Sequence, residues 1–148
     1  MKLLIIQTSP MHTASTLLIN AIYGLIPDLC DKKIIGIWGN EFENYFENYF
    51  ENIIVIKHHN IDIDGLINLY DKTYKLLFIC SERQEKNYLI DEKYKKYNNV
   101  VIFDFNELNE TLDNPLIKIV DNIYDKVKNV LPDIDLDKTK LNYGNNYN

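Results

Sequence analysis

The residues best suited to chemistry stand near the start of the chain, where a short apolar run leads into residues 9–16, SPMHTAST. A turn that leads from a strand into a helix presents unpaired backbone NH groups, and the helix dipole favours a negative group there. Thr13, Ser15 and Thr16 add three hydroxyls that can donate to a phosphate oxygen. A helix cap needs only one hydroxyl, so the three together favour an anion site over a cap made by Thr13 or Ser15 alone.

The spacing in this turn is that of the phosphate-binding loop GxxxxGK[ST]. Ser9 and Ala14 occupy its glycine positions, Ser15 its lysine position and Thr16 its hydroxyl position. Without the lysine, the turn lacks the charge that grips a triphosphate. It therefore predicts a site for a single phosphate group and not an ordinary NTPase loop.

The elements that must position this turn follow from short apolar runs that recur with room for a helix between them. The runs that predict strands are residues 3–6, 34–37, 53–56, 76–80 and 100–103. The patterns that predict helices are residues 15–26, 41–50, 62–74, 85–97 and 115–131. Alternating strands and helices indicate an α/β fold, and the near-continuous apolar runs indicate strands buried on both faces. We expect a three-layer, doubly wound sheet of about five parallel strands, with residues 9–16 at its carboxyl edge.

Length and composition indicate one domain. The chain has 148 residues, of which 46% are hydrophobic and 26% charged, so a substantial core is expected. We expect a single nucleotide-binding domain over residues 1–132 and a frayed, Asn-rich tail over residues 133–148.

The net charge and the cysteines limit which partners, location and metal the protein is expected to have. The net charge of −6 argues against nucleic acid and anionic membrane as partners. The first residues are too short an apolar run for a signal peptide or a spanning helix, so we expect a cytoplasmic protein. Cys30 and Cys80 have no metal-ligand spacing, which predicts buried or incidental thiols and no metal.

The turn resembles the 5′-phosphosulfate loop of the sulfotransferases, which reads approximately T-x-P-[RK]-S-G-T-T-x-L. In register with it are Thr13, Ser15, Thr16 and Leu18 of TSPMHTASTLL. The basic position is His12, which can donate to a developing negative charge when it is protonated or in the right tautomer. The glycine position is Ala14, which restricts the backbone. The resemblance implies that this turn, from Ser9 onward, binds the donor nucleotide.

A second resemblance lies in VIKHHN, which follows residues 53–56 and is similar to the KTH element of cytosolic sulfotransferases. It places Lys57 and His59 at the two functional positions. The resemblance implies that His59 is the general base for an acceptor hydroxyl and that Lys57 stabilises the leaving phosphate oxygen. His58 is expected to point away. For the tripeptide alone, an exposed polar loop is the favoured interpretation.

The run FICSERQEKN stands where the family carries a VRNPxD-like motif whose arginine contacts the 3′-phosphate of the donor. Direct register places Ser81 at the arginine position, and Arg83 follows two residues later, within reach of the same phosphate. A surface ion pair is an equally good interpretation of Arg83. Further along, Phe105, Glu107 and Leu108 match in type a structural YEDL-like run of the family.

Together these resemblances imply a sulfotransferase-like protein that moves a sulfuryl group from 3′-phosphoadenosine 5′-phosphosulfate to a hydroxyl acceptor without a metal. Only about twenty residues separate the fourth and fifth expected strands, where the family has a long acceptor-pocket insertion. A minimal or degenerate enzyme fits this length, as does one completed by a partner. A homo-oligomer is possible, and the sequence leaves the oligomeric state open.

Two alternatives remain. The opening MKLLIIQTSPMHTASTLLINAI also resembles that of flavodoxin-like FMN reductases, whose SPRxxSxT loop holds the flavin phosphate. Against this, the third expected strand is followed by KHHN and not by an aromatic or Gly-rich loop for the flavin ring. The other alternative is a catalytically inactive nucleotide-binding module, which His12 and Ala14 favour.

Overall fold

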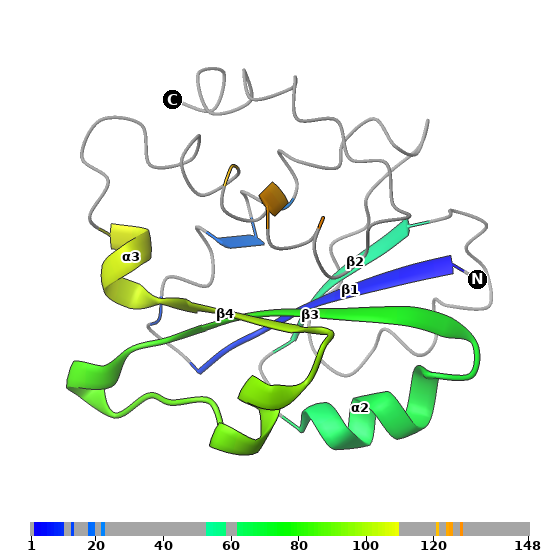
Figure 1. The fold of residues 1–148 in the computed structure, drawn as a ribbon, viewed down its shortest axis with the longest axis horizontal. Coiled ribbons are helices and arrows are strands. Elements are labelled where there is room, and N and C mark those ends of the chain that lie inside the picture. The colour runs from blue at the N-terminus through cyan, green and yellow to red at the C-terminus, as the bar shows by residue number, and fades with distance from the viewer. Residues whose placement is uncertain are drawn as a thin grey trace.

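Four parallel strands form one sheet in the computed structural model (Figure 1). The residues that the structure describes are 2–10, 13, 18–19, 22, 53–58, 62–109, 121, 124–125 and 128. The strands are β1 Lys2–Thr8, β2 Ile53–His58, β3 Tyr74–Glu82 and β4 Val100–Asp104. They lie in the order β2-β1-β3-β4, and each neighbouring pair is parallel. This confirms the predicted α/β class and four of the predicted strands.

Three expected elements fall outside the described residues: the strand at 34–37, the helix at 41–50 and the tail at 133–148. The helices expected at 15–26 and 115–131 are described only at single positions. Residues 18, 19 and 22 of the first and residues 121, 124, 125 and 128 of the second are helical.

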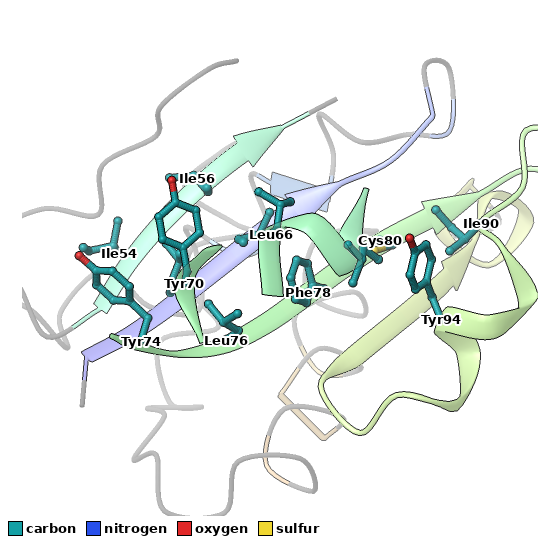
Figure 2. Close-up of a cluster of buried hydrophobic side chains, with 13 residues drawn as sticks. Ile54, Ile56, Leu66, Tyr70, Tyr74, Leu76, Phe78, Cys80, Ile90 and Tyr94 are labelled. Atoms are coloured by element: carbon teal, nitrogen blue, oxygen red, sulfur yellow. The ribbon is translucent and has the colours of Figure 1, made fainter. Parts of the chain in front are cut away.

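Strict alternation along the strands gives the sheet two apolar faces. One face is covered by α2, Ile63–Tyr70, which lies along the sheet in Figure 1. The cluster between them consists of Leu4, Ile6, Ile54, Ile56, Ile63, Leu66, Tyr70, Tyr74, Leu76, Phe78, Cys80, Ile90 and Tyr94 (Figure 2). The intervening residues of the strands, such as Ile5, Val55 and Leu77, are also buried, so the second face is covered as well.

The helix α2 ends earlier than the sequence pattern predicts. Asp62 caps its first turn by accepting a hydrogen bond from the Gly65 NH at 3.1 Å. Residues 71–73 form a turn, and Tyr74 already belongs to β3. Tyr74 therefore adds its ring to the core from the sheet, where it meets Tyr70 edge to face.

The prediction of one helix over residues 85–97 is wrong. The chain forms two short 3-10 helices instead, η3 Gln84–Lys86 and η4 Glu92–Lys96. Between them Asn87 adopts a left-handed conformation with φ 56°, which ends η3 and turns the chain back. Arg83 and Tyr88 then exchange two backbone hydrogen bonds, of 2.9 and 3.0 Å. These bonds close a short loop after β3, residues 83–88, which we call the finger.

Side-chain pairs fix this connection to the rest of the fold. Asp64 of α2 accepts a hydrogen bond from Tyr97 Oη at 2.7 Å and pairs with Lys93 at 3.0 Å. The buried Glu82 accepts a bond from the Ile90 NH at 3.1 Å and pairs with Lys95 at the same distance. The connection is thus held to α2 and to the end of β3 before the chain enters β4.

After β4 the chain forms α3, Phe105–Asn109, at the carboxyl end of the sheet. Asp104 accepts a hydrogen bond from the Asn106 NH at 2.8 Å as the helix begins. Within the described part of the chain, no helix is both long enough and apolar enough to cross a bilayer.

Candidate functional site

A cluster of buried hydroxyls joins the carboxyl ends of β1 and β3. Ser9 directly follows Thr8, the last residue of β1, and Ser81 is the penultimate residue of β3. The Ser81 NH donates to Ser9 Oγ at 2.8 Å, and the two hydroxyl oxygens lie 2.9 Å apart, at hydrogen-bond distance. Two residues 72 positions apart are therefore held together by a double contact.

Thr13 extends this cluster from the turn that follows β1. Its hydroxyl lies 2.9 Å from that of Ser81 and donates to the backbone carbonyl of Pro10 at 2.7 Å. Thr13 is thereby bonded both to its own turn and to β3. The structure thus brings together three residues that the sequence assigned to the anion site, namely Ser9, Thr13 and Ser81.

Gln7 completes the cluster, and no sequence motif pointed to it. Its amide Nε2 donates to Ser9 Oγ at 2.8 Å, and the residue is fully buried. The available signal was strand alternation, because Gln7 is a polar residue in an apolar strand and lies two residues before Ser9, on the same face. A polar residue at such a position needs a polar partner.

The hydrogen bonds at Ser9 leave one end of the Gln7 amide without a bond. Ser9 Oγ has three hydrogen-bond partners, whereas a hydroxyl oxygen has two lone pairs and one proton of its own. Thr13 donates its one proton to the Pro10 carbonyl, so Ser81 donates to Thr13 and Ser9 in turn donates to Ser81. The Gln7 Nε2 donates to Ser9, and its Oε1 is enclosed with no partner among the described residues. Such a buried atom suits a ligand group or an ordered water.

Lys57 lies on the same face as this cluster. In the register of β1 and β2, Gln7 pairs with Lys57, and side chains paired in this way project to the same side of a parallel sheet. Lys57 is only 2% exposed, and burial lowers the pKa of its ammonium. Because burial disfavours the charged form, an anion that reaches this group would be attracted strongly.

The order of the strands explains why these groups meet. From β1 the chain moves to β2 on one side and returns to β3 on the other side, so the direction of winding reverses between β1 and β3. At such a reversal the connections leave in opposite directions and open a crevice outside the carboxyl ends of the strands, where ligands of open α/β sheets bind. Ser9, Thr13 and Ser81 lie at that position.

Arg83 belongs to a different set of contacts. Its guanidinium pairs with Glu85, with Nη2–Oε1 2.5 Å and Nε–Oε1 2.6 Å, and its Cζ lies 3.9 Å from the centroid of the Phe105 ring. The ion pair is the alternative that the sequence left open for this residue. Arg83 nevertheless lies at the carboxyl edge, two residues after Ser81.

The other candidate residues lie outside the described residues. They are His12, Ala14, Ser15, Thr16 and His59. His58 ends β2 in register with Thr8 of β1. The assignment of His59 as general base stays a prediction.

The hydroxyls of the cluster bond to one another and to the turn, so the groups on this face that suit an anion are the backbone of the turn and the Lys57 ammonium. Over the described ranges, no group of three or more His, Cys, Asp or Glu side chains is arranged to hold a metal ion. The only carboxylate buried near the end of β3, that of Glu82 among the described residues, is paired with Lys95.

Comparison with known proteins adds no relative: no protein family, no curated protein and no solved structure matches this chain.

Proposed function

We propose that this chain binds a nucleotide through its phosphate groups where β1 and β3 end, and that it is a short, divergent sulfotransferase. The proposed donor is 3′-phosphoadenosine 5′-phosphosulfate, and the proposed acceptor is a hydroxyl. In this proposal the fold is the doubly wound, P-loop-like sheet of that family, with residues 34–37 as the expected fifth strand.

One observation carries the proposal: the buried Lys57 of β2 pairs in register with Gln7 of β1, two residues before the hydroxyl cluster begins. The sequence assigned Lys57 and the turn of residues 9–16 to one site although they are far apart in the chain. The parallel pairing of β1 with β2 supports this, because Lys57 and Ser9, the first residue of that turn, lie at the same edge and on the same face of the sheet.

The proposed reaction uses these groups in a simple displacement. The acceptor oxygen forms a bond to sulfur as its proton passes to His59, and the bond between sulfur and the donor phosphate oxygen breaks. The negative charge that develops on the leaving phosphate is stabilised by the Lys57 ammonium and by donors of the turn. The products are the sulfated acceptor and adenosine 3′,5′-bisphosphate.

A second candidate is an FMN-binding oxidoreductase, and a specific observation favours it. The order β2-β1-β3-β4 is also that of the first four strands of flavodoxin-like sheets, which bind FMN at the crevice between β1 and β3. An aromatic residue after the third strand is what a flavin ring needs. Among the described strands β3 is the third, and the finger that follows it carries Tyr88, which is 39% exposed.

Thermal unfolding of the whole chain with a panel of ligands tests both candidates. The panel consists of adenosine 3′,5′-bisphosphate, the phosphosulfate donor, FMN, ATP and inorganic phosphate. A ligand at a hundredfold excess over its dissociation constant stabilises the folded state by about 2.7 kcal/mol, which gives a clear shift in melting temperature. We expect the bisphosphate and the donor to shift the melt most.

The outcomes separate the hypotheses. A shift with FMN alone, or a yellow purified protein, would replace the sulfotransferase proposal by the flavin one. A shift with the bisphosphate but no sulfuryl transfer to a panel of phenols and alcohols would indicate an inactive nucleotide-binding module. Ser15→Ala and Thr16→Ala should each weaken bisphosphate binding by about 1.5–3 kcal/mol, the worth of a hydrogen bond to a charged group. Unchanged affinity in both variants would show that the turn does not hold the phosphate.

A further inference from the structure

Ser81 contacts the turn after β1 at two separate residues. Its NH donates to Ser9 Oγ at 2.8 Å, its hydroxyl oxygen lies 2.9 Å from the same atom, and its hydroxyl donates to that of Thr13 at 2.9 Å. These partners are 72 and 68 positions away in the sequence. The start and the middle of the turn are therefore both fixed to the last residues of β3.

The bonds are shielded from water. Ser81 and Thr13 have no exposed surface, and Ser9 is 1% exposed. Within a buried network each hydroxyl depends on the others, because a group that loses its partner there cannot replace it with water. In this arrangement the three hydroxyls bond to one another and to the turn, so they are not directed to a ligand in solution.

We infer that Ser81 is a positioning residue of the anion site: it holds the turn after β1 against the end of β3 and so sets the shape in which that turn meets a phosphate. This inference rests on the proposed function of the turn. It gives Ser81 a role different from the direct nucleotide contact that register with the sulfotransferase motif implies. A preformed turn binds an anion more tightly because less ordering accompanies binding.

The inference also explains why the cluster bridges β1 and β3 and not β1 and β2. The winding reverses between β1 and β3, and in open α/β sheets this is where ligands bind. Hydrogen bonds from β3 hold the turn after β1 at Ser9 and Thr13. The Gln7 amide of β1 also donates to Ser9.

The test compares variants that remove a hydroxyl with variants that keep it. Ser81→Ala and Thr13→Val each remove one partner of the Thr13–Ser81 contact, and valine preserves the shape of threonine. Thr13→Ser keeps the hydroxyl and is the rescue variant. Thr73→Ala, which removes an exposed hydroxyl at the other end of β3, is the control. Affinity for adenosine 3′,5′-bisphosphate is measured by titration calorimetry, and hydrogen exchange is measured at the Ser81 amide.

We expect Ser81→Ala and Thr13→Val each to weaken bisphosphate binding by on the order of tenfold, and the double variant to be no weaker than the worse single variant. Thr13→Ser should bind within about twofold of the natural chain, as should Thr73→Ala. Ser9→Ala removes the acceptor of the Ser81 NH and should accelerate exchange at that amide by at least on the order of tenfold.

Distinct results would overturn the inference and the proposed function. If the natural chain binds the bisphosphate and Ser81→Ala and Thr13→Val bind it equally well, the positioning role is wrong while the anion site stands. If Thr13→Ser is as weak as Thr13→Val, the methyl group and not the hydroxyl matters, and the inference also fails. If the natural chain binds no member of the ligand panel, the proposed function is wrong, and the role inferred for Ser81 is wrong with it. Should Ser81→Ala not fold, the comparison of Thr13→Val with Thr13→Ser decides.

Discussion

Cζ of Arg83 lies 3.9 Å from the centroid of the Phe105 ring, and the same guanidinium is paired with Glu85. A cation over an aromatic face and a carboxylate at its edge together hold Arg83 in one orientation. Arg83 follows β3 and Phe105 follows β4, so the pair joins two neighbouring strand ends at the edge proposed to bind nucleotide. If the proposed nucleotide binds at this edge, Glu85 competes with its phosphate for Arg83.

The first prediction concerns this competition. Glu85→Gln removes the carboxylate charge and should tighten binding of adenosine 3′,5′-bisphosphate by about two- to fivefold, with the gain shrinking as salt is added. Stability should change by less than about 1 kcal/mol, because the pair is partly exposed. Glu92→Gln is the control, since it makes the same charge change in the exposed pair with Lys95. Equal effects in both variants would mean that only overall charge matters and that Arg83 does not reach the ligand.

The second prediction separates stability from binding at Lys57. Burial lowers the pKa of this lysine below its ordinary value of 10.5, so the folded state releases its proton at a lower pH than the unfolded state does. The unfolded chain then binds more protons between the lowered pKa and 10.5, and stability rises with pH across that window. Lys57→Met should remove this rise.

The same variant also removes the buried ammonium that lies on the face of the hydroxyl cluster. It should bind the bisphosphate at least on the order of tenfold more weakly. Melting curves from pH 7 to 10.5 and calorimetric titration check both effects, with Lys72→Met in the exposed turn after α2 as the control. A destabilised Lys57→Met protein with unchanged affinity would assign Lys57 to structure alone.

The third prediction concerns the general base. With the phosphosulfate donor and a competent phenol acceptor, His59→Ala should lower the rate by on the order of a hundredfold or more while donor affinity is kept. His58→Ala, one residue earlier, is the matched control and should have little effect. Equal rates for His59→Ala and the natural chain would remove this residue from the proposed mechanism.

The fourth prediction concerns Cys80, a buried free thiol. Burial raises its pKa from 9.0 to about 12, so the reactive thiolate is scarce at neutral pH. In a Cys30→Ser variant, which leaves Cys80 as the single cysteine of the chain, iodoacetamide should label the protein only after denaturation. Rapid labelling of the native protein would contradict the burial.

The sign of the pH effect for Cys80 is opposite to that for Lys57. The folded state keeps the thiol proton between pH 9 and about 12, whereas the unfolded state loses it. The contribution of the thiol to stability is therefore complete below pH 9 and is lost as the pH rises toward 12. Comparison of Cys80→Ala with the natural residue in denaturant titrations at pH 8 and 10.5 measures this loss.

The fifth prediction concerns the start of α2. Asp62→Ala removes the cap and should cost about 1 kcal/mol. Gly65→Ala would ordinarily stabilise a helix by about 1 kcal/mol, but a Cβ at this position would lie 2.3 Å from Asp62 Oδ2 and displace the capping carboxylate. In the natural background the two effects should nearly cancel.

Once Asp62 is alanine, Gly65→Ala should recover about 1 kcal/mol, because no carboxylate stands in its way. Urea denaturation of the two single variants and the double variant checks this coupling. Additive effects would show that the cap survives the extra methyl group.

The four strands that the structure describes were predictable because their pattern does not depend on distant residues. Runs such as residues 76–80 are apolar at successive positions, which suits a strand covered on both faces, and the structure extends this run to Tyr74–Glu82. The pattern over residues 85–97 misled because charged and polar residues fill both a surface helix and a connection held by ion pairs. Asn87, whose side chain tolerates the left-handed region, was the signal for a break.

The grouping of some candidate residues could be predicted from the sequence, whereas their use in binding stays a prediction. Spacing within residues 9–16 singled out Ser9 and Thr13, and their burial against Ser81 agrees with one shared location. The partnership of each hydroxyl was not visible in the sequence, because it depends on which strands are neighbours and on their register. Gln7 was missed for the same reason. Its place in the site follows from its pairing with Lys57 in the neighbouring strand and from its hydrogen bond to Ser9 after the end of β1.

The central place of β1 in the sheet has a consequence for how the protein is made. Leu3 pairs with Ile53 and with Lys75, so both partners of β1 lie about fifty and seventy residues later in the chain. At a synthesis rate of about 5–20 residues per second, the ribosome releases β1 several seconds before β3 exists. Until β2 has been made, the segment KLLIIQT has neither of its partner strands, and until β3 follows it still lacks one of them, so its apolar side chains stay open to a chaperone or another nascent chain. Formation of the sheet must then wait for the closure of long loops, which places this fold among the slower folders.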